Sequence, residues 1–299
     1  MQKKQKNIGQ PQVKGPDWFI IGFFIIAHTL AAIGLTMPTR GGMIAFAILY
    51  PITALGITLG YHRYFTHRSF KSPRWLSYIF AVMGTMALQG SLIEWIAHHR
   101  MHHAGSDTNR DPHNARRGFW YSHLMWMFVV MPEFDDQRNM RRYTRDIIAD
   151  PFLFWLCKPW VMIGMQVLIG IICWRLGGIE AMMWGVWVRI VALYHATWAV
   201  NSAAHIWGYR NYDVGDLATN NWFVALITMG EGWHNNHHAF SESARHGQKW
   251  WELDVTWLLI RTLKALGLAT EIKLAPGLSP PSLAVSPSVA VPDIAAAGK

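Results

Sequence analysis

The sequence predicts an all-α integral membrane protein, with four transmembrane helices in two hairpins and a cytoplasmic helical cap that holds a histidine-rich metal site. Three observations lead to this fold class. Of the 299 residues, 52% are hydrophobic and only 15% are charged, whereas a soluble domain carries about a quarter charged residues. The mean hydropathy is still only +0.12, so a large polar part of the chain must lie in water. The third observation is the 15 histidines, most of which occur in clusters.

The chain contains four apolar segments that are each long enough to cross a bilayer as a helix. They are residues 18–37, 42–61, 152–174 and 181–203. Short loops around Arg40 and Arg175 join them in pairs, which gives two hairpins. Nearly all other Lys and Arg residues lie at the opposite ends of the hairpins, beginning with the basic segment 1–17, and such positive charge marks the cytoplasmic side. We therefore expect both termini in the cytoplasm and the chain in a bacterial-type inner membrane.

A fifth apolar segment, residues 75–93, is not expected to cross the membrane. Histidines stand just before it, at His62 and His67, and just after it, beginning at His98. If these histidines share one site, the segment must return to the face from which it started. The sequence after residue 274 is rich in Pro, Ala and Ser. We therefore predict a membrane domain over 18–274 and a disordered tail over 275–299.

Three short motifs contain eight of the imidazoles: His62-Arg-Tyr-Phe-Thr-His67, His99-Arg-Met-His102-His103 and His234-Asn-Asn-His237-His238. The last two share the pattern HxxHH. On a helix, positions i, i+3 and i+4 lie on one face, so each of these boxes presents three imidazoles to one point. Neutral imidazole binds Fe, Zn, Cu and Ni, and this many ligands exceed what one ion holds. Two metal ions are therefore implied, rather than histidines in ordinary packed or solvated positions.

The other histidines are judged by their positions in the chain. His205 follows Asn201 by four residues at the cytoplasmic end of the fourth segment, so both are expected to face the boxes, and His205 is predicted to be a ligand. His98 points about 100° away from His99 on a helix, toward the substrate or toward groups that support the ligands. Four more histidines lie inside apolar segments or have no box around them, and ordinary packing is expected for these. They are His28, His123, His195 and His246.

Carboxylates near the boxes are suited to hold ligand imidazoles in one tautomer. The candidates are Glu94, Asp107, Asp111, Asp213, Asp216 and Glu231. Among them Asp111 and Glu231, together with His113, are predicted to support the metal ligands.

Five stretches between about Tyr50 and Leu274 resemble the membrane-bound fatty acid desaturases, specifically the stearoyl-CoA desaturase-like delta-9 family with its bacterial and cyanobacterial members. They read GITLGYHRYFTHRSF, EWIAHHRMHH, DPHNARRGFWYSH, NSAAHIWGYR and GEGWHNNHHAF. The resemblance implies two Fe²⁺ ions, O₂ as co-substrate, and a metal-bound water held by Asn201. The iron ligands it implies are His62, His67, His99, His102, His103, His205, His234, His237 and His238.

The resemblance also implies a bent tunnel that holds the acyl chain beside the irons. The residues that resemble the lining at its bend are Gln89, Trp95 and Thr197, and Trp198 is also expected to bind the substrate. Tyr50 and Ala54, one helical turn apart, resemble the residues that close the far end. A small side chain such as Ala there leaves room for a chain of about 16 to 18 carbons.

The function expected from the resemblance is the oxygen-dependent insertion of a cis double bond at delta-9 into a saturated C16–C18 acyl chain. The carrier of the acyl chain is CoA, acyl carrier protein or a membrane lipid, and Ala97-His98 stands where the animal enzymes have an Arg-Asp pair for CoA, which favours a carrier other than CoA. The electron donor is expected to be a separate protein of the ferredoxin, rubredoxin or cytochrome b5 type.

Two alternative functions are a fatty acyl or alkane hydroxylase of the same membrane di-iron class and a non-catalytic metal carrier or transporter. No nucleic-acid partner is expected, because the net charge of +9 comes without a dense Lys/Arg tract.

Overall fold

The computed structural model describes residues 10–278, so the first nine residues and most of the predicted tail lie outside it. The described chain is mainly helical, with one short antiparallel pair of strands in which Gly15 faces Val130. The elements up to the middle of the chain are β1 Gly15–Pro16, α1 Trp18–Leu35, α2 Arg40–Leu55, η1 Gly56–Thr66, α3 Arg74–Thr85, α4 Leu92–Gly105, η2 Ala115–Arg117, α5 Phe119–His123, η3 Met125–Phe128 and β2 Val129–Val130. The remaining elements are α6 Pro132–Asp135, α7 Gln137–Tyr143, α8 Arg145–Ile148, α9 Pro151–Leu156, α10 Pro159–Met182, η4 Met183–Val188, α11 Arg189–Asn201, η5 Ala203–His205, α12 Trp222–Ile227, α13 His234–Ala239 and α14 Val255–Ala265.

Three helical stretches of the described chain are long and apolar enough to cross a membrane: Trp18–Leu35, Arg40–Thr66 and Pro159–His205. Their outward surfaces carry large apolar side chains, for example Phe19, which is 79% exposed, and Ile25, which is 62% exposed. Such a surface is unfavourable in water and suits the hydrocarbon of a bilayer. The expectation of a mostly helical membrane protein is thus confirmed.

A short turn joins α1 to α2 close to Arg40, where the sequence places the first hairpin loop. The side chain of Asp17 accepts a hydrogen bond from the backbone N–H of Ile20 and begins α1. Thr39 does the same for Gly42 and begins α2. Both helices then pack against the π-helical turn η4, so α1 and α2 are held by a later part of the chain rather than by each other.

Helix α2 continues directly into the π-helical η1, and the two together carry the chain to the first histidine motif. This path requires Gly56, because a Cβ atom there would lie 2.2 Å from the carbonyl carbon of Met83 in α3. Close packing of α3 on η1 therefore fixes the end of the helix that presents His62.

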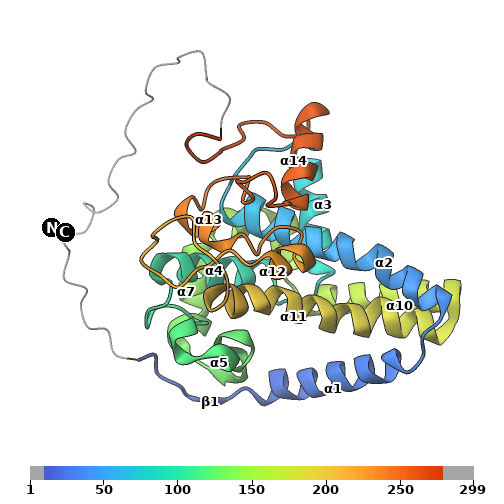
Figure 1. Ribbon diagram of the computed structural model, residues 1–299. Coiled ribbons are helices and arrows are strands. Elements are labelled where there is room, and N and C mark those ends of the chain that lie inside the picture. The colour runs from blue at the N-terminus through green and yellow to red at the C-terminus, as the bar shows by residue number, and fades with distance from the viewer. Residues whose placement is uncertain (1–9, 279–299) are drawn as a thin grey trace.

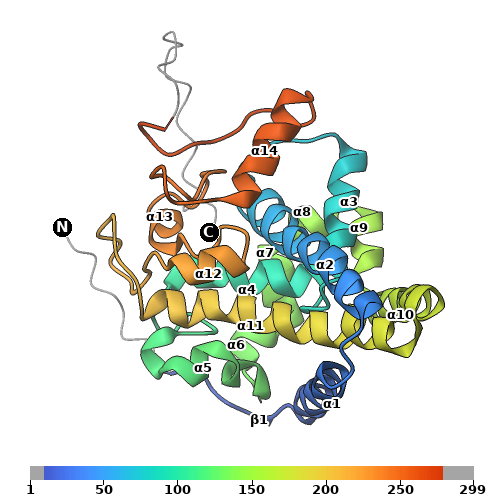
Figure 2. The same cartoon turned by 45° about the vertical axis from the view of Figure 1, so that its right-hand side comes forward.

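The third apolar stretch begins at Pro159 rather than at Phe152, because α9 ends at Leu156 and Lys158 is extended. Proline has no backbone N–H and cannot continue a preceding helix, although it is favourable in a first turn. Inside α10, Gly177 and Gly178 have non-helical backbone angles, with a φ of 77° at Gly178. The chain changes direction there, and α11 runs back from the α10 end of the molecule (Figures 1 and 2).

The apolar segment 75–93 forms two helices rather than one. Helix α3 has 12 residues, about 18 Å, which is shorter than the roughly 30 Å hydrocarbon core. A turn over residues 86–91 separates it from α4, and both Leu88 (φ 56°) and Gly90 (φ 82°) adopt left-handed backbone angles in it.

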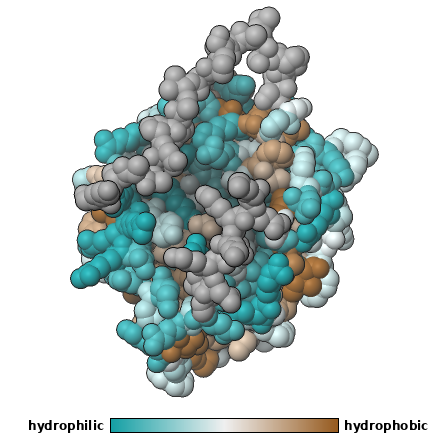
Figure 3. Space-filling view, turned by 90° about the vertical axis from the view of Figure 1, so that its left-hand side faces the viewer, coloured by the Kyte–Doolittle hydropathy of each residue, from teal (hydrophilic) through white to brown (hydrophobic). Residues whose placement is uncertain are grey.

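The helices that carry the clustered histidines lie toward one end of the molecule. Figure 1 shows α4, α5, α7 and α13 grouped away from the turn in α10. The face at this end is largely hydrophilic where it is not covered, with apolar side chains mainly near its edges (Figure 3). The low mean hydropathy implied that a large polar part of the chain lies in water. This polar surface is gathered at the same end as the histidines.

Candidate metal centre

Four elements and one turn present the histidines of the three motifs together with His205. His62 lies on η1 and His67 directly follows it. Helix α4 begins with a capping box, in which the Ser91 side chain and the Glu94 carboxylate each bond the other residue's backbone N–H. This start fixes the register of the second HxxHH motif on α4, while the third motif forms α13 and His205 ends η5.

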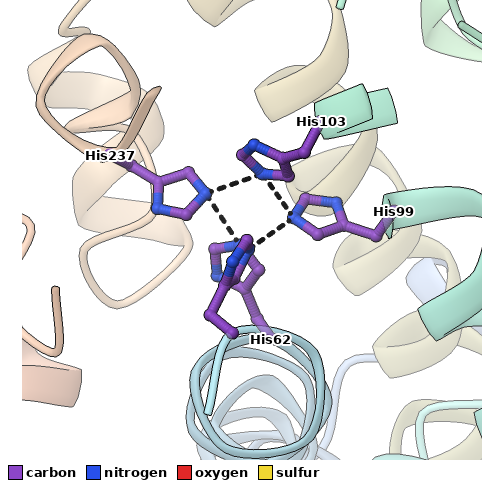
Figure 4. A group of neighbouring side chains, drawn as sticks. His62, His99, His103 and His237 are labelled. Carbon is purple, nitrogen blue, oxygen red and sulfur yellow. Dashed lines mark hydrogen bonds between the residues drawn. The ribbon is translucent and has the colours of Figure 1, made fainter. Parts of the chain in front are cut away.

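The first group of imidazoles surrounds a single point. Its members are His62, His67, His99, His103 and His237, and one nitrogen of each lies within 4.8 Å of those of the others. Neighbouring Nε2 atoms are 3.2 Å apart between His62 and His237, 3.0 Å between His237 and His103, and 3.1 Å between His103 and His99. Figure 4 shows these rings pointing toward one another from three different parts of the chain.

A second group lies beside the first and contains His102, His205, His234 and His238. The Nε2 atoms of His102 and His238 are 3.3 Å apart, and those of His205 and His234 are 3.0 Å apart. The nine predicted ligands therefore divide into sets of five and four.

Each HxxHH motif contributes to both groups. Helix α4 directs His99 and His103 to the first group and His102 to the second. Helix α13 directs His237 to the first and both His234 and His238 to the second. The expectation that each box presents all three imidazoles to one point was wrong. Neighbouring positions i+3 and i+4 point about 100° apart around a helix, so their imidazoles face two adjacent points.

Carboxylates lie close to the Nδ1 atoms of four of these imidazoles and accept hydrogen bonds from three of them, His102, His205 and His238. Nδ1 lies 2.6 Å from Glu231 in His62, 2.8 Å from Asp111 in His102, 3.0 Å from Asp107 in His205 and 2.6 Å from Asp216 in His238. An imidazole that donates its Nδ1–H in this way keeps the lone pair on Nε2, which is the atom that faces the other histidines.

This arrangement requires a positive charge between the imidazoles. His102 and His238 both direct Nδ1–H at a carboxylate, so two Nε2 lone pairs face each other unless a proton or a metal ion lies between them. In an octahedral shell with metal–nitrogen distances of about 2.1 Å, adjacent ligand atoms lie about 3.0 Å apart. The separations in both groups, 3.0–3.3 Å, are close to this value. The residues present therefore fit two metal ions.

The protonation states also favour metal binding. Burial, assisted by neighbouring imidazoles, lowers the pKa of five histidines well below the ordinary value, so they are neutral at pH 7. They are His67, His99, His103, His234 and His237. Burial also lowers the pKa of His238 to about 4 despite the opposing Asp216. For His102 burial again lowers the pKa, but Asp111 and two further carboxylates outweigh it and the pKa is raised, so a metal ion competes with a proton there.

Behind His62 lies a buried charge network that the sequence did not indicate. The Arg63 guanidinium is fully buried and donates to Glu231 at 3.1 and 3.0 Å and to Asp254 at 3.0 Å. His246, for which ordinary packing was expected, lies 3.1 Å from Glu231. Burial raises the pKa of Glu231, but Arg63, His62 and His246 outweigh burial and hold that pKa well below its usual range. Glu231 was expected to support the ligands, but for Arg63 the available signal was its position next to His62.

The remaining candidates have varied surroundings. His113 lies 3.4 Å from Asp111, which is shared with His102. Glu94 caps α4, and Asp213 is exposed, so within residues 10–278 neither belongs to a metal-capable group.

Three histidines expected to pack between helices form a hydrogen-bonded chain that ends on the Ser202 hydroxyl. They are His28, His195 and His123.

A cavity of about 380 Å³ leads to the imidazoles, and its lining is mostly apolar and aromatic. The predicted bend residues lie on it: Gln89, Trp95, Thr197 and Trp198, together with Asn201, His98, His99 and His113. The Gln89 amide donates to the Thr197 hydroxyl at 2.8 Å.

A smaller cavity of about 40 Å³ shares Trp95, His99, Thr197 and Asn201 with the large cavity. Its lining also includes His62 of the first group, His234 of the second group and Ala54. Tyr50 donates to the Ile227 carbonyl at 2.7 Å and, among the described residues, is not part of either lining.

The sequence pattern of fatty acid desaturases matches residues 41–269, a range that includes every histidine of both groups. The chain belongs to the fatty acid desaturase family. Within this family, the sn-1 stearoyl-lipid 9-desaturase of Anabaena variabilis is 47% identical over 89% of this chain and 96% of its own length. The sn-2 palmitoyl-lipid 9-desaturase of Nostoc sp. (strain 36) is 41% identical over 89% and 92%. The icosanoyl-CoA 5-desaturase of Limnanthes douglasii is 44% identical over 84% and 70%.

In this desaturase-family chain, Asp216→Asn is expected to weaken metal retention by about 10- to 100-fold. The amide keeps the size of the carboxylate but no longer fixes the Nδ1 proton of His238. Metal content measured after dialysis against graded chelator checks this, with Asp213→Asn, a change at an exposed carboxylate, as the control. Equal metal retention in the two variants would contradict a supporting role for Asp216.

Proposed function

We propose that this chain is an acyl desaturase that introduces a cis double bond at delta-9 into saturated C16–C18 acyl chains carried by a membrane lipid. The observation that carries this proposal is a mostly apolar cavity that reaches His99 of the first group, together with a smaller cavity that is lined by imidazoles of both groups. A long, shaped apolar space is what an unactivated hydrocarbon needs, and a pair of metal-capable groups beside it is what its oxidation needs. The relatives named as lipid 9-desaturases support the position and the carrier.

The two groups of histidines would hold two iron ions, and Asn201, which lines both cavities, would hold a water beside them. When bound, iron with O₂ supplies an oxidant strong enough to remove hydrogen from an unactivated methylene. The carboxylates that accept from His102, His205 and His238 would keep protons on Nδ1 and leave Nε2 free for the metals. This division of roles among the nine histidines and Asn201 is part of the proposal.

The cavity residues would position the acyl chain. Trp95 and Thr197 line both cavities, so a chain that passes them lies next to His99 with one methylene pair nearest the metals. The apolar walls exclude water, which protects the oxidant from side reactions. Regiospecificity then depends on which methylene pair reaches this point.

We also propose that the apolar stretches form four spans, with the third stretch divided at Gly177 and Gly178, and that segment 75–93 remains on the cytoplasmic side. Both termini and the histidine groups would then face the cytoplasm, as in a bacterial-type inner membrane. The polar surface seen in Figure 3 and the histidine-bearing helices seen in Figure 1 lie at the same end, which supports this arrangement. Electrons would come from a separate ferredoxin, rubredoxin or cytochrome b5 type protein.

The decisive experiment is expression in a host that lacks unsaturated fatty acids. We expect new acyl chains that are lighter by two hydrogen atoms, with the double bond at delta-9, and we expect them first in an intact lipid class rather than in acyl-CoA. Products that are heavier by one oxygen atom would indicate a hydroxylase instead. A purified protein that holds zinc alone and makes no double bonds would refute the proposal.

Chain-length selection gives a separate prediction. Ala54 is buried at the small cavity, so Ala54→Leu is expected to shorten the space for the end of the acyl chain. The ratio of C16 to C18 products should rise by about 10-fold or more, as is usual for a methylene-sized change in an apolar pocket. Ala47→Leu, on the exposed face of the same helix, is the control. An unchanged ratio in Ala54→Leu would remove Ala54 from the substrate site.

A further inference from the structure

Arg189 is a charged side chain that is fully buried inside an apolar stretch. It is the first residue of α11, and the proposed reaction assigns it no role. Ionisable residues within membrane segments are unfavourable unless they are paired, and they usually have a function.

The guanidinium of Arg189 binds oxygens from three parts of the chain. It donates to the carbonyl of Met86 at 2.7 Å, to the amide oxygen of Gln166 at 2.8 Å and to the carbonyl of Gly185 at 2.9 Å. Gln166 also donates to the Met86 carbonyl, at 3.1 Å. Among residues 10–278, Arg189 forms no ion pair with a carboxylate. Met86 caps the C-terminus of α3, where the partial negative charge of the helix compensates the cation.

The turn that Arg189 holds is a strained one. Leu88, two residues after Met86, has a φ of 56°, a left-handed angle that is unfavourable for a bulky side chain. The hydroxyl of Tyr194 donates to the Leu88 carbonyl. Arg189 and Tyr194, both on α11, thus fix two carbonyls of this turn, and such strain persists only where the surroundings hold it.

This turn forms a wall of the large cavity. Leu88, Gln89 and Gly90 all line it, and Gln89 reaches across to Thr197 on α11. The turn leads directly into the capping box that begins α4, the helix that presents Trp95 and His99. Any displacement of the turn therefore moves the wall relative to the imidazoles.

We propose that Arg189 is a positioning residue that determines where along the acyl chain the double bond is placed, by holding the turn over residues 86–91. The inference rests on the proposed desaturase activity. A displacement of about 1 Å at a reacting centre costs on the order of 100-fold in rate. A turn released from Arg189 would therefore allow a neighbouring methylene pair to compete for the position nearest the metals.

The test is the position of the double bonds, measured by mass spectrometry of derivatised fatty acids from cells that express each variant. In Arg189→Met, the ratio of all other positions to delta-9 should rise at least about tenfold over wild type, about 1.4 kcal/mol in relative barrier height. Arg189→Lys, which keeps the charge and one carbonyl contact, should show a smaller rise, and so should Tyr194→Phe, which removes one hydrogen bond to the same turn. His28→Leu removes a polar side chain of α1 that does not contact the turn, and should leave the ratio unchanged.

Several outcomes separate this inference from a general role in stability. A fall in the amount of product with an unchanged position would mean that Arg189 only stabilises the fold, and would overturn the proposal. If Arg189→Met does not accumulate in the membrane, an unchanged position in both Arg189→Lys and Tyr194→Phe overturns it equally. A wild-type protein that makes no double bonds refutes the proposed desaturase activity itself, and this inference with it.

Discussion

His237→Ala is expected to abolish desaturation while the protein still inserts into the membrane. His237 is fully buried in the group of five imidazoles, and its Nε2 lies 3.2 Å from that of His62 and 3.0 Å from that of His103. Removing it leaves the first group with four imidazoles and takes away the one that α13 contributes. The loss should exceed the roughly 100-fold that follows from removing a group behind a ligand.

Two measurements check this expectation: the amount of double bonds in the lipids of expressing cells, and the metal content of the purified protein. Both should fall in His237→Ala and remain in His28→Ala, which alters a histidine outside the two groups. A His237→Ala protein with wild-type activity and metal content would remove His237 from the ligand set.

Arg63→Met is expected to destabilise the protein by about 3–5 kcal/mol, the usual cost of removing one partner from a buried ion pair. The side chains of Glu231 and Asp254 are themselves almost fully buried, and they would lose their common cation. The Ala244 carbonyl would lose its donor as well. Met is similar to Arg in length, so the change removes mainly the charge and the hydrogen bonds.

The control for this variant is Arg68→Met, five residues along the chain. Arg68 also pairs with a carboxylate, Asp146, at 2.7 Å, but its side chain is 64% exposed. Exposed pairs contribute about 0–1 kcal/mol, so its unfolding free energy should be nearly that of wild type. Thermal unfolding of both variants in the same detergent measures the difference. Equal stability in the two variants would show that the buried network is not needed for folding.

Local patterns in the sequence predicted the parts of this protein that depend on helical periodicity and on chain-breaking residues. The HxxHH spacing brought the imidazoles to one region. The chain turns before Arg40, and again at Gly177 and Gly178, just after Arg175, close to the expected ends of the apolar segments. The early end of α9 was missed because a run of apolar residues outweighed the local effect of Pro159.

Contacts between distant parts of the chain could not be predicted in this way. Arg63 and Asp254 are 191 residues apart, and no periodicity relates them. The division of each HxxHH motif between two groups depends on which elements stand opposite α4 and α13, which is a tertiary property. The same holds for Arg189, whose partners come from the turn after α3, from α10 and from η4.

The sharing of α4 and α13 between the two groups has a consequence for how the two proposed metal ions would bind. Whichever group is filled first orders both helices, and with them several ligands of the other group, so the second ion binds a site that is already assembled. We expect loading to be cooperative: at limiting iron, a titration would find chains with no ion and chains with two, and few with one.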